Sequence, residues 1–89
     1  MVASNSLWPD WWSWELDTGS PHLAKRMRDR QFTETDLRDM LECAMRVSPN
    51  HEPDRWVAET QWRGAAWEVV LEPLVDERTL LVITAYKVG

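Results

Sequence analysis

Apolar residues recur at helical spacing in two adjoining segments of the first half of the chain. Ser20 and Pro21 favour a helix start, because serine accepts free N–H groups of the first turn and proline fits the first helical position. This helix is expected to run to about Arg30, and Leu23 and Met27 form its apolar face.

A second helix is predicted directly after the first. The segment Thr33-Glu-Thr-Asp36 is close to a capping box, in which two side chains satisfy free N–H groups of the first turn. The apolar residues that follow are spaced i, i+3, i+4 and i+7, which is typical of an amphipathic helix. They are Leu37, Met40, Leu41 and Ala44.

The second half of the chain has the composition of strands: the first two alternate, whereas the last is apolar on both faces, as expected for a central strand. Three strands are expected, at about 55–62, 65–71 and 79–87, after a loop at 48–54 that contains two prolines. Residues 12–17 also alternate and predict a short leading strand. In the last strand, Thr84 and Tyr86 are expected to share a face with Leu80 and Val82, because they occupy alternate positions.

Together these elements predict an α+β fold. Two N-terminal helices are expected to pack on one face of a three- to four-stranded antiparallel sheet, in the order strand, helix, helix, strand, strand, strand. A length of 89 residues suits one domain, assigned to residues 11–89, with residues 1–10 as a flexible tail.

The composition indicates in which cellular compartment the protein is expected. A single cysteine, Cys43, excludes an internal disulfide and a cysteine-based zinc site within one chain. The first residues do not resemble a secretory signal, and no apolar run approaches the roughly 18 residues of a membrane helix. A cytoplasmic protein without membrane contact is therefore expected.

Charge is unevenly distributed along the chain. The formal net charge of −5 argues against indiscriminate nucleic-acid binding. Residues 22–30 are the exception, because they hold Lys25, Arg26, Arg28 and Arg30 against Asp29 alone. One basic helix is therefore expected on an acidic protein.

The basic helix also carries the candidate chemistry. His22, Arg26 and Arg30 recur at one-turn spacing. Arginine binds phosphate bidentately and histidine exchanges protons near neutral pH, so the set is a candidate anion site. A solvated basic helix with a histidine near its start explains the same pattern. The hydroxyls of Thr84 and Tyr86 are either hydrogen-bonded core groups or groups that face this helix.

No cofactor motif accompanies these residues. The sequence contains no Gly-rich phosphate loop, no His-Glu-x-x-His and no Cys-x-x-Cys. His51, beside Glu52 and Asp54, has too few convergent ligands around it for a metal. Any phosphate chemistry is therefore expected to be independent of metals and cofactors.

The basic helix and the start of the second helix read His22-x-x-x-Arg26-Met27-x-x-Arg30-x-Phe32-Thr33-x-x-Asp36-Leu37. This order resembles the opening of a widespread uncharacterised bacterial domain family. The similarity continues through Arg55-Trp56-Val57 and Trp67-Glu68-Val69-Val70 to the ending at Tyr86, and so covers about residues 12–88. That family is similar in layout to the RelE/BrnT-like toxins, which cut RNA without a metal.

The resemblance implies a metal-independent endoribonuclease of toxin–antitoxin type, with RNA and an antitoxin protein as partners. It implies that His22 is the general acid or base and that Arg26 and Arg30 bind the scissile phosphate. Thr84 and Tyr86 would border the site from the last strand. A second proton-transfer group would be Tyr86 or Lys25, and a further phosphate contact would be Arg55.

A second hypothesis is a non-catalytic interaction module. Four of the seven tryptophans lie within the first fourteen residues, beside an acidic stretch. They are Trp8, Trp11, Trp12 and Trp14. Exposed aromatic clusters mark interfaces, and an edge strand paired with its own copy produces a homodimer. This pattern therefore favours a homodimer or a partner complex formed through the N-terminus.

Overall fold

The computed structural model describes residues 8–88, so residues 1–7 of the predicted tail lie outside the described part. Two helices, α1 (Pro21–Arg30) and α2 (Glu34–Glu42), precede most of the sheet. The strands are β1 (Glu15–Asp17), β2 (Arg46–Pro49), β3 (Trp56–Trp62), β4 (Ala65–Leu74) and β5 (Thr79–Lys87). Within residues 8–88 there are also two short 3-10 turns, η2 (Asp10–Ser13) and η3 (Val75–Glu77).

The five strands form one mixed sheet in the order β1-β5-β4-β3-β2. The α+β class and the position of the helices before most strands are confirmed. The expectation of a purely antiparallel sheet with three or four strands was wrong, because β1 runs parallel to β5 and β2 adds a fifth strand. Alternation of side chains shows that a segment is a strand, but it does not show which neighbour the strand will pair with or in which direction.

Strand β2 forms partly within the segment predicted as a loop. Its register pairs Arg46 with Glu59 and Pro49 with Trp56. Proline fits at this position because β2 is an edge strand, where a missing N–H need not interrupt a hydrogen-bond ladder. Arg46 also forms an ion pair with Glu59, with Nη2 and Oε2 2.9 Å apart.

Both helices begin where the sequence predicts. The Ser20 hydroxyl accepts a hydrogen bond from the N–H of Leu23 at 3.4 Å. Thr33 and Asp36 complete the predicted capping box, with reciprocal bonds of 3.1 and 2.9 Å. In the described part of the chain, neither helix has the length and apolar character that crossing a lipid bilayer requires.

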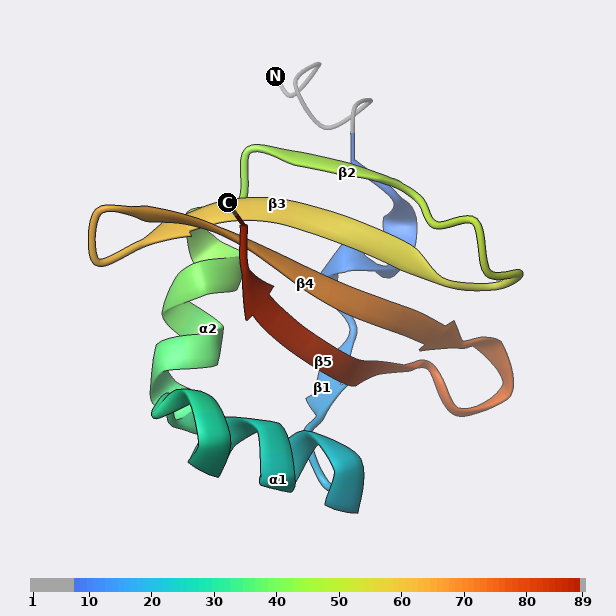
Figure 1. Cartoon of the computed structure of the whole chain (residues 1–89). Helices are drawn as coiled ribbons and strands as arrows, with labels where there is room; N and C mark the ends of the chain where they lie inside the picture. Colours follow the sequence, from blue (N-terminus) through green and yellow to red (C-terminus); the bar gives the residue numbers. More distant parts are fainter. Residues whose placement is uncertain (1–7, 89) are drawn as a thin grey trace.

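The helices cover one face of the sheet, as Figure 1 shows, which confirms the predicted packing. α1 packs mainly on β5 and α2 on β3. The buried core combines residues from both layers, and each large apolar side chain in it stabilises the fold by roughly 1.5–3 kcal/mol. Its members are Leu23, Phe32, Leu37, Met40, Leu41, Ala58, Trp67, Val69, Leu71, Leu80, Val82 and Ala85.

A bulge in β5 changes the face that its last residues present. The register against β4 shifts by one residue, so Ile83 has no partner on that strand. Ala85 is therefore buried on the helix side with Val82, whereas Thr84 and Tyr86 point to the outer face. The prediction that Thr84 and Tyr86 share a face with Val82 was wrong, because simple alternation does not include the extra residue.

Tryptophans of the N-terminal segment pack against this core. Trp11, Trp12 and Trp14 are half-buried and contact core residues. The ring of Trp8 lies against Trp12, with the two centroids 4.9 Å apart. Large rings add much buried area to a small core, so the segment from η2 to β1 contributes to the packing of the domain.

Thr60 joins the last turn of α2 to β3. Its side chain is buried, and its hydroxyl donates a hydrogen bond to the carbonyl of Met40. Carbonyl groups in the last turn of a helix have no partner within the helix. The Thr60 hydroxyl therefore supplies the donor for a buried carbonyl in the last turn of α2.

We expect Thr60→Val to lower the free energy of unfolding by about 1–3 kcal/mol, because the similarly shaped side chain leaves the Met40 carbonyl without its donor. Urea unfolding followed by circular dichroism measures the change. Thr35→Val is the matched control on the exposed side of α2 and should change stability by less than about 0.5 kcal/mol. Equal losses in the two variants would contradict this role of Thr60.

Candidate functional site

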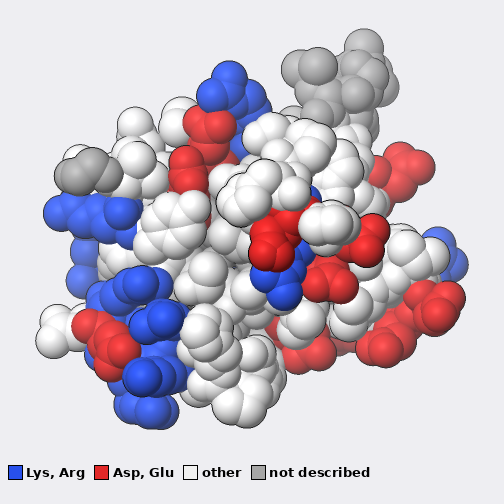
Figure 2. Space-filling model, turned by 45° about the vertical axis from the view of Figure 1, so that its right-hand side comes forward, with Lys and Arg blue, Asp and Glu red and all other residues white. Residues whose placement is uncertain are grey.

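Helix α1 presents a basic outer face, defined here as Lys25, Arg26, Arg28 and Arg30. Leu23 is fully buried toward the sheet, so the charged positions of the helix are turned toward solvent. Figure 2 shows Lys and Arg side chains gathered at the lower left, whereas Asp and Glu prevail toward the centre and right. On this face of the molecule, the largest group of basic side chains is therefore separate from most of the acidic ones.

His22 and Arg26 lie one turn apart at the start and middle of α1. The His22 side chain is exposed, and within residues 8–88 it forms no hydrogen bond or ion pair. Arg26 Nη1 is 3.9 Å from Asp29 Oδ2, and the two side chains are 34% and 51% exposed. An ion pair at this distance near the surface contributes little. His22 and Arg26 are therefore both free to contact an anion.

Arg30 is held at the unpaired edge of β5. Its Nη1 donates to the backbone carbonyl of Ala85 at 2.8 Å and more weakly to the Thr84 hydroxyl at 3.4 Å. β1 pairs only with the first residues of β5, so the guanidinium covers a part of the edge that β1 does not reach. A guanidinium has five N–H donors, so Arg30 keeps donors for an anion.

The structure brings Arg30 and Thr84 together but leaves His22 two turns away. A helix rises 1.5 Å per residue, which separates His22 from Arg26 by about 6 Å and from Arg30 by about 12 Å along the axis. A single phosphate can therefore contact His22 and Arg26 together. Arg30 would contact a neighbouring phosphate of the same strand.

Tyr86 lies on the outer face of β5, two residues from Thr84. Its hydroxyl donates to Glu68 Oε1 at 2.6 Å. This hydrogen bond to a carboxylate, together with partial burial, raises the pKa of Tyr86 to about 12. The phenol is therefore protonated at neutral pH, so it can donate a proton but cannot accept one.

Arg55 lies apart from α1. It immediately precedes β3, and β3 is two strands away from β5. Its guanidinium contacts two carboxylates: Nε is 3.5 Å from Glu72 Oε1, and Nη1 is 4.0 Å from Glu52 Oε1. Two strand spacings amount to about 10 Å, so Arg55 and Arg30 do not converge on one phosphate.

The α1 surface can bind anions, and it contains one group, His22, that can transfer a proton. Across the described range, no three or more His, Cys, Asp or Glu side chains converge as a metal site. The arrangement can bind the backbone of a polyanion along α1 and can move a proton at His22. Lys25 lies three residues from His22, on the same side of the helix, and is the nearest second donor along the chain.

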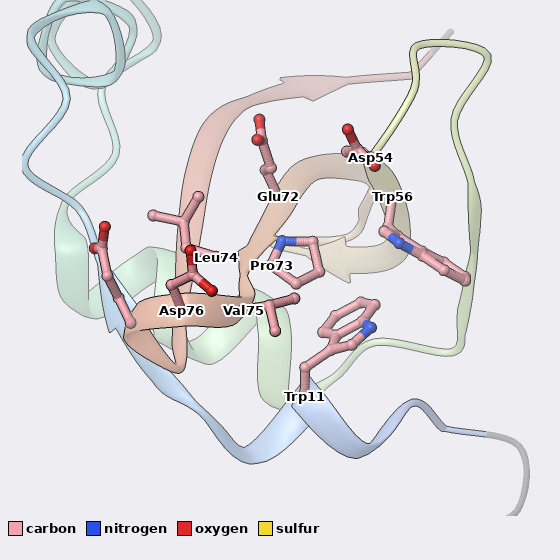
Figure 3. A pocket seen from close by; sticks show the side chains of 9 residues that line it. Trp11, Asp54, Trp56, Glu72, Pro73, Leu74, Val75 and Asp76 are labelled. Atoms are coloured by element: carbon pink, nitrogen blue, oxygen red, sulfur yellow. The ribbon is translucent and has the colours of Figure 1, made fainter.

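A hollow that the sequence did not indicate lies near the other end of β5, where η3 leads from β4 into that strand. Its volume is about 450 Å³, and Figure 3 shows its walls. It is lined by Trp11, Asp54, Trp56, Glu72, Pro73, Leu74, Val75, Asp76 and Glu77. Its tryptophans come from distant segments, so no local pattern reveals them as a pair. The recurrence of acids from Glu72 to Glu77 is the one sequence signal.

We expect the stability of the protein to fall between pH 10 and about pH 12 through Tyr86. The group is protonated in both states below pH 10, so its contribution is fully present there. Above pH 10 the unfolded chain ionises first, and the contribution is lost as the pH rises toward the folded-state pKa of about 12. Between pH 10 and about pH 12, the free energy of unfolding of the Tyr86→Phe variant should fall less than that of the unaltered protein.

The same pKa can be read directly, because the chain has one tyrosine. Tyrosinate absorbance against pH gives its value, and Glu68→Gln should move it back toward 10, since the anionic acceptor is lost. A pKa near 10 in the unaltered protein would refute the contact with Glu68.

No protein-family model, no curated protein and no solved structure matches this chain. The resemblance carried by His22, Arg26 and Arg30 therefore stays a prediction, as do the roles it implies for these residues.

Proposed function

We propose that the protein binds RNA along α1 and cleaves it without a metal, in the manner of a toxin from a toxin–antitoxin pair. The observation that carries the proposal is the pair of exposed His22 and half-buried Arg26, one turn apart on a helix whose last arginine is anchored at the edge of β5. An imidazole and a guanidinium at this spacing can share one phosphate.

The chemistry needs few groups. Attack by the 2′-hydroxyl of RNA on the adjacent phosphate requires a proton acceptor, a proton donor and positive charge at the phosphate. His22 is the acceptor and Arg26 supplies the charge. Lys25 is favoured as the donor, because the Tyr86 hydroxyl is engaged by Glu68 and would first have to leave it.

The acidic balance of the chain is compatible with an RNA substrate. Carboxylates prevail away from α1 (Figure 2), so a polyanion would be attracted to the basic face and repelled elsewhere. The same face would suit an antitoxin with acidic side chains, which could cover the basic face and compete with RNA.

We expect Arg26→Ala to weaken binding to single-stranded RNA and to lower the slope of log K against log salt by about 0.7, since one phosphate contact is lost. Fluorescence anisotropy at several salt concentrations measures both. Arg78→Ala removes the same charge at the turn between β4 and β5 and should leave the slope unchanged. Equal effects of the two variants would mean that α1 is not the binding surface.

Cleavage is tested with the same RNA in the presence of a chelator. His22→Ala should retain most of the binding but stop product formation, and should relieve any growth arrest that expression of the unaltered chain causes. RNA left intact by the unaltered chain would overturn the catalytic part of the proposal. The anisotropy series would then decide whether binding alone is retained.

We infer a second candidate role, protein association through the tryptophan-rich segment, from the position of Trp8. Its ring lies on Trp12 beside a hollow of about 470 Å³ that Pro9, Asp10 and Ser13 also line. β1, which follows this segment, is an edge strand with one side free in the sheet. An aromatic surface next to a free edge favours a second copy of the chain as the partner.

We expect Trp8→Ser to convert a homodimer into a monomer without a large loss of stability, because Trp8 contacts Trp12 rather than the buried core. Light scattering after size-exclusion chromatography gives the mass, and thermal unfolding checks the fold. Removing residues 1–14 is less informative, since it also deletes Trp11, Trp12 and Trp14 from the packing. A chain that is monomeric with and without Trp8 would rule out this association.

A further inference from the structure

The hollow near η3 is walled by two tryptophans that meet at an angle. Trp11 comes from η2 and Trp56 opens β3; their ring centroids are 5.3 Å apart and their planes are inclined at 62°. Figure 3 shows the two side chains together on one side of the hollow, with Leu74 and Asp76 on the other. Both indoles are half-buried, so each still exposes part of its ring.

Negative charge surrounds this ring surface. Four of the lining side chains are carboxylates: Asp54, Glu72, Asp76 and Glu77. Glu72 has a basic partner in Arg55, at 3.5 Å, whereas within residues 8–88 the other three form no ion pair. The faces of indole rings are also electron-rich. Both features favour a positively charged ligand.

The volume of the hollow and the spacing of its acidic side chains indicate which kind of cation would fit. Among the described residues, no three acidic, histidine or cysteine side chains converge closely enough to hold a metal ion. A volume of about 450 Å³ instead lies within the range of small-molecule sites, roughly 300–1,000 Å³. A bulky cation can rest on the ring faces while the carboxylates act on it from a distance.

A methylated ammonium fits this hollow better than a bare one, because the two differ in how strongly water hydrates them. A bare ammonium is strongly hydrated, and an open hollow with dispersed acids offers few direct hydrogen bonds to replace that water. N-methyl groups spread the charge and present apolar surface that matches indole, proline and valine. Aromatic walls that bind quaternary ammonium groups use this combination.

We propose that the hollow beside Trp11 and Trp56 binds a small methylated ammonium ion. The cationic head lies against the two indoles, with Asp54 and Asp76 supplying negative potential. Arg55 keeps its contact with Glu72, so that carboxylate contributes less. The site is separate from α1 and does not depend on the proposed ribonuclease activity.

The test uses choline and its neutral isostere, 3,3-dimethylbutan-1-ol, with the full chain. Binding is followed through the indole N–H signals of the isotope-labelled protein in NMR spectra, assigned by single tryptophan substitutions. We expect choline to shift the signals of Trp11 and Trp56, and the alcohol to bind at least about tenfold more weakly, since it lacks the charge.

Variants separate the ring contribution from the charge contribution. Trp56→Leu should weaken choline binding about tenfold, whereas Trp56→Phe should restore part of it. Asp76→Asn should weaken binding of choline and leave binding of the alcohol unchanged. Trp62→Leu is the control at the far end of β3, where Arg63 already covers the ring at 4.2 Å, and should have no effect on choline.

Two results would overturn the proposal: no shift at Trp11 and Trp56 with saturating choline, or equal binding of choline and the alcohol. A short peptide with one trimethyllysine is titrated in parallel to identify the source of the ligand. Tighter binding of choline supports a free small molecule. Tighter binding of the peptide supports the same site for the same head group, presented by a modified lysine.

Discussion

The structure depends on the burial of one face of the sheet under two short helices. Leu23 from α1 and Leu37 and Met40 from α2 are fully buried, and they meet Val69 and Val82 on the central strands. A domain of this size buries a limited share of its surface, so these contacts supply much of the favourable free energy. They also set the direction of every other side chain on the helices, because a helix that buries one stripe must expose the rest.

The basic face is a consequence of that constraint. Leu23 and Met27 face inward on α1, and the intervening positions carry Lys and Arg outward. Arg30 is the transition between the two sides, since it follows the apolar stripe by one turn and reaches the backbone of β5. One side chain thus covers an unpaired strand edge and fixes one end of the basic face. Structural and binding roles are compatible because a guanidinium has more donors than the edge uses.

The tryptophans of the N-terminal segment cover part of the core that the helices leave open. Two helices of ten and nine residues cannot cover every strand. Rings from the N-terminal segment fill part of the remaining space, with Trp11, Trp12 and Trp14 against the core. Packing of a rigid ring leaves part of its surface outside, and Trp11 meets Trp56 at such a point. The hollow near η3 and its negative surroundings arise there and share no residues with the basic face of α1, so the two candidate surfaces carry charge of opposite sign.

The sequence by itself determined the local elements. Serine and threonine caps, the apolar stripes of the helices, the alternation of β3 and β4 and the apolar run of β5 are local patterns. The basic character of residues 22–30 is likewise evident from the sequence. Tertiary structure decided the rest: the parallel pairing of β1 with β5, the extra strand β2, the bulge at Ile83, and the meeting of Trp11 with Trp56. The physical reason is the distance along the chain between the residues that interact. Capping and periodicity depend on neighbours within about one turn of chain, whereas strand partners, register shifts and cavity walls depend on which distant surfaces bury the most area together.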